Sequence, residues 1–209
     1  MFLSFDGGEG SGKSTQIELT CKWLRDLGHN VIACRDPGST ELGDAVREIL
    51  LHRSDLLIHR RSEMLLYMAA RAQLVEQIIR PALNQGLTVV SDRYLLANIA
   101  YQGYAGGLDI EVILNVGRIA TDGIMPDLTI FLDVPLAISA ARINRPLDRM
   151  ERMGDEFHIK VREGFLAEAA KSPNIKVVDA TDSIDKVQAK IRETIQNYFR
   201  GNNGSIRDE

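Results

Sequence analysis

The feature that most constrains the fold of this chain is a glycine-rich segment near its start. It reads Gly7-Gly8-Glu9-Gly10-Ser11-Gly12-Lys13-Ser14, with Thr15 next. An apolar run, Phe2–Asp6, precedes it and a stretch with helical periodicity, Ser14–Leu27, follows it. The pattern G-x-x-x-x-G-K-[ST] thus stands in the strand–loop–helix context of a phosphate-binding loop. Glycines let backbone N–H groups converge on phosphate oxygens, and the start of the helix adds its positive end. We therefore expect this segment to bind a nucleoside triphosphate, with Lys13 at the β- and γ-phosphates and the Ser14 hydroxyl on Mg²⁺.

The rest of the sequence alternates between short apolar runs and longer helical periods. The predicted strands are Phe2–Asp6, Val31–Arg35, Thr88–Ser91, Leu128–Asp133 and Lys176–Asp179. The predicted helices are Ser14–Leu27, Glu41–Leu51, Arg61–Gln85, Leu108–Thr121, Leu136–Asn144, Glu156–Ala170 and Ile184–Phe199. Alternation of this kind predicts βαβ units, hence an α/β fold with a parallel five-stranded sheet and helices on both faces.

Length and composition narrow the class of protein. The 209 residues contain no internal repeat and no low-complexity linker, which predicts a single domain over residues 1–200 and a flexible tail over 201–209. The formal charge of −4 argues against a non-specific nucleic-acid binder. No apolar run is long enough to cross a membrane, no signal peptide opens the chain, and Cys21 and Cys34 are its only cysteines. We expect a soluble cytoplasmic protein.

A phosphate-binding loop serves both switches and enzymes. A GTPase switch would also carry an Asp-x-x-Gly and an Asn-Lys-x-Asp segment, and the sequence has neither. This favours an enzyme that transfers a phosphoryl group to a small acceptor.

Five segments, taken in order, carry a more specific resemblance. They are the phosphate loop, Arg35-Asp36-Pro37-Gly38-Ser39-Thr40 with Arg47, Tyr67-Met68-Ala69-Ala70-Arg71, Ser91-Asp92-Arg93-Tyr94 with Asn98, Tyr101 and Gln102, and Arg145-Pro146-Leu147-Asp148-Arg149. With them the chain resembles the thymidylate kinase family from its first strand to about Ala180. The resemblance implies a P-loop NTPase fold of the nucleoside monophosphate kinase kind, and the reaction ATP + dTMP → ADP + dTDP with Mg²⁺, in dTTP biosynthesis. It also implies a homodimer.

Asp92 and Arg93 stand at the end of the third predicted strand. Asp92 can hold Mg²⁺ through water, and Arg93 offers a two-pronged donor for a phosphate. A structural Asp–Arg pair is the alternative. By resemblance, Arg47 is a second ligand of the acceptor phosphate.

Tyr67 and Arg71 are four residues apart, so they share a face of one helix and can clamp a pyrimidine. Arginine can only donate hydrogen bonds, which suits the C4 carbonyl of thymine and not the amino group of cytosine. The resemblance adds further acceptor-site residues: Glu9, Asp36, Asn98 and Tyr101. It also shows a departure, because Ala97 stands where many relatives have serine.

A cluster of arginines follows the fourth predicted strand. Arg142, Arg145, Arg149 and Arg152 would share one face if the segment were helical, although Pro146 interrupts it. The variable positions of the phosphate loop hold no basic residue. The resemblance therefore implies a mobile lid over about 142–156, from which Arg145 and Arg149 meet the transition-state charge. A solvated, salt-bridged helix is the alternative.

Two other functions stay open from the sequence alone. One is a kinase for another nucleoside monophosphate or for a deoxynucleoside. The other is a regulatory module that binds ATP without turnover.

Overall fold

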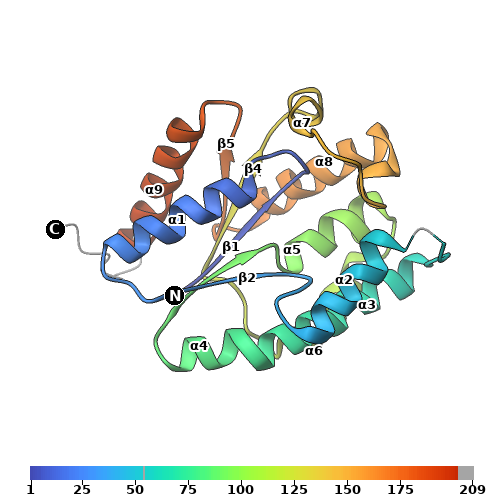
Figure 1. The fold of residues 1–209 in the computed structure, drawn as a ribbon, viewed down its shortest axis with the longest axis horizontal. Coiled ribbons are helices and arrows are strands. Elements are labelled where there is room, and N and C mark those ends of the chain that lie inside the picture. The colour runs from blue at the N-terminus through green and yellow to red at the C-terminus, as the bar shows by residue number, and fades with distance from the viewer. Residues whose placement is uncertain (54, 202–209) are drawn as a thin grey trace.

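The computed structural model describes residues 1–53 and 55–201, and its centre is a five-stranded parallel sheet (Figure 1). The strands are β1 (Phe2–Gly7), β2 (Val31–Arg35), β3 (Thr88–Asp92), β4 (Leu128–Asp133) and β5 (Ile175–Asp179). Their order is β2-β3-β1-β4-β5, with β1 in register so that Leu3 pairs with Val90 of β3 and Leu128 of β4. The predicted strands are confirmed, apart from one residue at an end of β1, β3 and β5.

Helices connect the strands. They are α1 (Lys13–Asp26), α2 (Glu41–His52), α3 (Arg60–Leu74), α4 (Arg80–Asn84), α5 (Leu95–Asn98), α6 (Ile110–Thr121), α7 (Leu136–Arg142), α8 (Asp155–Lys171) and α9 (Ile184–Gly201). Wider π-helical turns, η1 (Val75–Ile79) and η2 (Ile99–Ala105), join α3 to α4 and extend α5. The predicted helix Arg61–Gln85 is therefore continuous but contains a π turn. No helix is predicted from the sequence for residues 95–105, where α5 and η2 lie.

Each face of the sheet has its own apolar core. On one face, α1 and α9 pack on β1, β3 and β4 through side chains such as Phe5, Leu24 and Ile191. On the other face, α3, α5, α6 and α8 cover Phe2 and Phe131. Figure 1 shows the two layers of helices on either side of the sheet. All strands run the same way, so their carboxyl ends meet at one edge, where open α/β sheets bind ligands.

The segment between α7 and α8 differs from the sequence expectation. It is helical only at its ends: α7 stops at Arg142, and a short 3₁₀ turn, η3 (Glu151–Met153), precedes α8. The arginines of this segment therefore do not share one helix face. Pro146 has no N–H to donate, and the Asp148 carboxylate accepts from the backbone N–H groups of Met150 and Glu151, which starts the turn afresh.

Two other expectations concern the ends and the surface of the chain. The predicted flexible tail begins at Gly201, which is the last residue of α9, and its residues 202–209 lie outside the described part of the chain. Among the described helices none is both long and apolar enough to cross a membrane.

Candidate active site

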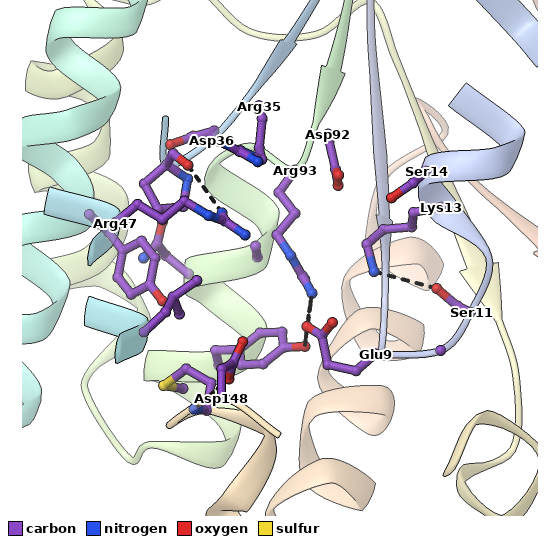
Figure 2. A pocket seen from close by; sticks show the side chains of 18 of the residues that line it. Glu9, Ser11, Lys13, Ser14, Arg35, Asp36, Arg47, Asp92, Arg93 and Asp148 are labelled. Carbon is purple, nitrogen blue, oxygen red and sulfur yellow. Dashed lines mark hydrogen bonds and ion pairs between the residues drawn. The ribbon is translucent and has the colours of Figure 1, made fainter. Parts of the chain in front are cut away.

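A cavity of about 370 Å³ opens at the carboxyl edge of β1, β2 and β3. It brings together nearly all the residues singled out from the sequence. Those lining it are Glu9, Gly10, Ser11, Gly12, Lys13, Ser14, Thr15, Asp36, Arg47, Tyr67, Arg71, Asp92, Arg93, Asn98, Tyr101 and Arg145. Gly7, Gly8 and Arg149 do not line it. Figure 2 shows the phosphate loop on one side, Asp36 and Arg47 on the other, and Arg93 between them.

The phosphate loop needs glycine at two places. Gly10 has a φ of +71°, and a Cβ there would lie 2.2 Å from the Ser139 carbonyl oxygen. Gly12 precedes α1 with a φ of +87°, in the left-handed region that favours glycine. No side chain caps the first turn of α1, so its N-terminal amide groups can bind an anion.

Lys13 points along this loop and is 8% exposed. Its Nζ donates hydrogen bonds to the carbonyls of Gly7 and Gly8, at 3.0 and 2.9 Å. Burial lowers the pKa of Lys13, and nearby Arg93 adds to that, while Glu9 and Asp92 act in the opposite direction. A buried cation at the end of β1 is suited to phosphate oxygens.

Unpaired carboxylate oxygens lie beside this lysine. Both oxygens of Asp6 and the Oδ1 atom of Asp92 are buried without a hydrogen-bond partner in the described residues. Burial raises the pKa of Asp6 to about 7, although Arg93 and Lys13 lower it in part. Within residues 1–53 and 55–201, this place included, no three His, Cys, Asp or Glu side chains cluster as a metal site of their own. Magnesium commonly uses one or two carboxylates, water and substrate phosphates, and the unpaired oxygens with the nearby Ser14 hydroxyl fit that donor set.

Arg93 is held at the centre of the cavity by an unusual backbone. Its φ is +69°, a conformation that costs energy for a side-chain-bearing residue and that is concentrated at functional sites. Its Nη2 atom donates to Glu9 and, at 3.3 Å, to the Tyr101 hydroxyl, while its Nη1 atom is buried without a partner in the described chain. Burial by itself raises the pKa of Glu9. The nearby charges of Arg93 and Lys13 outweigh the effect of burial and lower the pKa of Glu9 to about 2. Arg93 therefore has donors left for a phosphate.

The side of the cavity away from the phosphate loop is organised around Arg71. Its Nε atom donates to the Asp36 carboxylate at 2.5 Å, and both side chains are at most 1% exposed. Arg47 donates to the Pro37 carbonyl at 3.2 Å and extends toward the same space. Tyr67 lies one helical turn before Arg71 and lines the same cavity. The positions of Tyr67 and Arg71 are thus compatible with the pyrimidine clamp expected from their spacing.

The lid arginines go to different partners. Arg145 lines the cavity and forms two hydrogen bonds with the Glu151 carboxylate, at 2.8 and 2.6 Å. Arg149 lies outside it, with Nε donating to the Leu50 carbonyl at 2.6 Å and Nη2 paired with Glu63. In this conformation Arg145 is the better placed of the two.

Three residues of the site were not proposed from the sequence as functional. Asp6 ends an apolar strand directly before the phosphate loop, which is a signal that could have been used. Glu63 stands four residues before Tyr67, on the same helix face, and the structure places it in contact with Gln102. Gln102 follows Tyr101 but has no chemical signature of its own.

A parallel α/β sheet, a phosphate loop with a buried lysine, and arginines that line the same cavity define a P-loop phosphotransferase. Comparisons with known proteins agree. The family model described as thymidylate kinase matches residues 5–191. A thymidylate kinase of Rhodopirellula baltica is 44% identical over 90% of this chain and 77% of that protein. One of Thermosipho africanus is 41% identical over 96% of this chain and its own full length. The crystal structure of thymidylate kinase from Ehrlichia chaffeensis superposes with a TM-score of 0.76 at 32% identity, covering 94% of this chain and 98% of that one. The chain belongs to the thymidylate kinase family.

Proposed function

We propose that the protein transfers the γ-phosphoryl group of ATP to dTMP, giving ADP and dTDP. The observation that carries this proposal is the single cavity that is lined both by the phosphate loop and by Tyr67 and Arg71. Figure 2 shows Arg93 between the loop and Asp36, the ion-pair partner of Arg71. An oxygen of the dTMP phosphate attacks the γ-phosphorus as the bond to the β–γ bridging oxygen breaks. That oxygen is already ionised at neutral pH, so the reaction requires no general base.

The chain's own residues then act by position and charge. Lys13 and the amide groups at the start of α1 hold the β- and γ-phosphates, and Arg93 holds the acceptor phosphate. A bound Mg²⁺, held by Ser14 and through water by Asp92, would neutralise charge on the transferred group. Glu9 pairs with Arg93 and thereby fixes the direction of its guanidinium.

Selection of the base rests on Arg71. Asp36 holds its Nε atom, and the remaining donors can meet the C4 carbonyl of thymine. Cytosine would place an amino group against those donors. Tyr67 supplies an apolar ring for the pyrimidine, and Asn98 and Tyr101 complete the pocket wall. Discrimination against dUMP is smaller, because one methyl group contributes only about 0.8 kcal/mol.

Residues 1–200 act as a single kinase domain with a lid at about 142–156. Supporting evidence is the irregular chain from 143 to 150, whose Arg145 reaches the cavity. Lid closure would exclude water from the γ-phosphate.

The protein acts as a homodimer. Apolar side chains stay exposed on three helices that lie together in Figure 1: Leu42 on α2, Leu65 on α3, and Val112 and Ile119 on α6. Such a surface favours association with a second copy. A cytoplasmic location and the lack of a nucleic-acid partner stay predictions from composition.

The testing experiment is a coupled ADP-release assay with ATP, Mg²⁺ and each of dTMP, dUMP, dCMP, dGMP and AMP. We expect the highest kcat/KM with dTMP. A higher value with another monophosphate would favour the alternative kinase, and ATP binding without acceptor-dependent ADP release would favour a regulatory module. No specific observation in the structure favours either alternative.

A further inference from the structure

A chain of buried polar side chains runs from the acceptor cavity to the lid, with Glu63 at its centre. Glu63 is 7% exposed, and Asn98 and Gln102 are each 2% exposed. Gln102 Nε2 donates to Glu63 Oε1 at 2.9 Å, and Asn98 Nδ2 donates to Gln102 Oε1 at 2.7 Å. The other carboxylate oxygen, Oε2, accepts from Arg149. Of these side chains, Asn98 and Gln102 line the cavity.

The direction of these hydrogen bonds follows from the chemistry of a carboxylate. An ionised carboxylate only accepts, so Gln102 must present its NH₂ group to Glu63. Gln102 Oε1 then faces Asn98, which must present its own NH₂ group in turn. This leaves Asn98 Oδ1, which is buried and has no partner among the described residues. Glu63 thus decides which end of the Asn98 amide is free, although it does not line the cavity itself.

Asn98 lines the same cavity as Tyr67 and Arg71, so an unpaired acceptor on its side chain has a consequence for base recognition. Thymine and uracil carry a donor at N3, whereas cytosine carries an acceptor there. The Asn98 oxygen can accept a hydrogen bond from N3 of thymine or uracil. With cytosine, the same oxygen would face the N3 acceptor, and neither atom could donate. Unpaired buried polar groups are the usual origin of strong discrimination between similar ligands.

We propose that Glu63 is a positioning residue for base selection, which orients the amides of Gln102 and Asn98 so that the pyrimidine meets an acceptor oxygen. This inference rests on the proposed function. Glu63 acts through Gln102 and does not contact the base. Its second contact, with Arg149, anchors the lid and is separate from the selection of the base.

The variant Glu63→Gln tests this directly. Glutamine has the same size, but its NH₂ group can donate to Gln102, which lets both downstream amides turn over and present Asn98 Nδ2 to the base. We expect kcat/KM for dTMP relative to dCMP to fall by about tenfold or more, mainly through a higher KM for dTMP. The ratio of dTMP to dUMP should stay at the wild-type value, because both bases carry the N3 donor. A merely structural role would not separate these two ratios.

Four further variants isolate the mechanism. Glu63→Asp keeps an acceptor-only carboxylate and should keep most of the dTMP-over-dCMP preference. Arg149→Met cuts the contact to the lid and should leave that preference unchanged, even where turnover falls. Glu48→Gln, on an exposed position of α2, is the matched control for loss of one negative charge. Should Glu63→Gln not fold, Gln102→Leu cuts the same chain on the other side of the carboxylate and should lower the same ratio.

The outcomes distinguish a failure of the proposed function from a failure of the proposed role of Glu63. A wild-type enzyme without a preference for dTMP over dCMP would overturn the proposed function. A wild-type preference that persists undiminished in folded Glu63→Gln or Gln102→Leu would overturn this inference alone. Equal losses with dTMP, dUMP and dCMP would also overturn it, because they would mark Glu63 as structural.

Discussion

The two sides of the cavity are built differently. On the acceptor side, Arg71 and Asp36 form an ion pair that is at most 1% exposed, at the end of β2. On the lid side, Arg145 is 56% exposed and pairs with Glu151 on an irregular segment. The acceptor groups are therefore fixed before a ligand arrives, since breaking a buried pair is costly. The partner carboxylate of Glu151 is only 2% exposed, but it also accepts a hydrogen bond from the Asp148 N–H, so the half-exposed Arg145 can turn toward a phosphate while Glu151 keeps a partner.

This contrast assigns different kinetic roles to the two sides. A preorganised pocket should control which acceptor binds and how tightly. A mobile arginine that engages the phosphates late should control turnover. The phosphate loop is needed for both binding and turnover. The loss of turnover on removal of Lys13 is therefore the reference for the effects of variants on either side.

The largest effect is expected for Lys13→Ala. Removal of the buried cation from the phosphate loop should lower kcat by on the order of 10³. The fold should survive, because Nζ bonds to loop carbonyls and not to the core. Steady-state kinetics and a melting curve check both points. Near-normal turnover by the folded variant would show that the loop is not the phosphate site.

The lid arginines come next. Arg145→Ala should lower kcat by on the order of 10², with the Michaelis constants for ATP and dTMP nearly unchanged. Arg149→Ala should lower kcat too, and the double variant shows whether the two share one role. If even the double variant turned over at the wild-type rate, the segment would be only a charged surface.

Arg71→Ala sharpens the comparison from the acceptor side. Loss of a charge-assisted hydrogen bond costs roughly 1.5–3 kcal/mol, so we expect the dTMP dissociation constant to rise by about 10- to 100-fold. ATP affinity should stay near the wild-type value. Titration calorimetry with each nucleotide measures both. Unchanged dTMP affinity with weakened ATP binding would mean that the base clamp is wrongly assigned.

A last effect concerns stability and pH and leaves catalysis aside. Because burial raises the pKa of Asp6 from 3.8 to about 7, the folded state holds this proton more tightly than the unfolded state. The free energy of unfolding should therefore fall as pH rises through that window, by about 3 kcal/mol between pH 5 and pH 8. Asp6→Asn should remove this contribution. Urea unfolding of both proteins at the two pH values measures it, and equal pH dependence would show that Asp6 ionises normally in the folded protein.

The sequence predicted the fold, and it singled out Tyr67 and Arg71, which line one cavity, because the signals for both are local. Apolar runs such as Leu128–Asp133 mark buried strands, and the i, i+4 spacing of Tyr67 and Arg71 survives in any regular helix. The glycine pattern before Lys13 is likewise recognised from the residues directly before and after it. Each of these features depends on residues within a few positions of one another.

What the sequence did not predict depends on distant contacts. Glu63 is joined to Gln102 and to Arg149 across 39 and 86 residues, so no spacing rule could link them. The arginines of the lid looked helical by their spacing, but Pro146 and the Asp148 side chain redirect the chain there. The π turn η2 places Tyr101 and Gln102 in the cavity wall, and periodicity gives no signal for such a turn.

The central claim is that one cavity carries a phosphoryl group directly from the phosphate loop to the clamped acceptor. Incubation with ATP labelled in its γ-phosphate, Mg²⁺ and dTMP tests it, with the products separated by chromatography. We predict that the label appears in dTDP and scarcely in inorganic phosphate, and that omission of dTMP leaves it in ATP. Label released as inorganic phosphate at the same rate with and without dTMP would contradict the account.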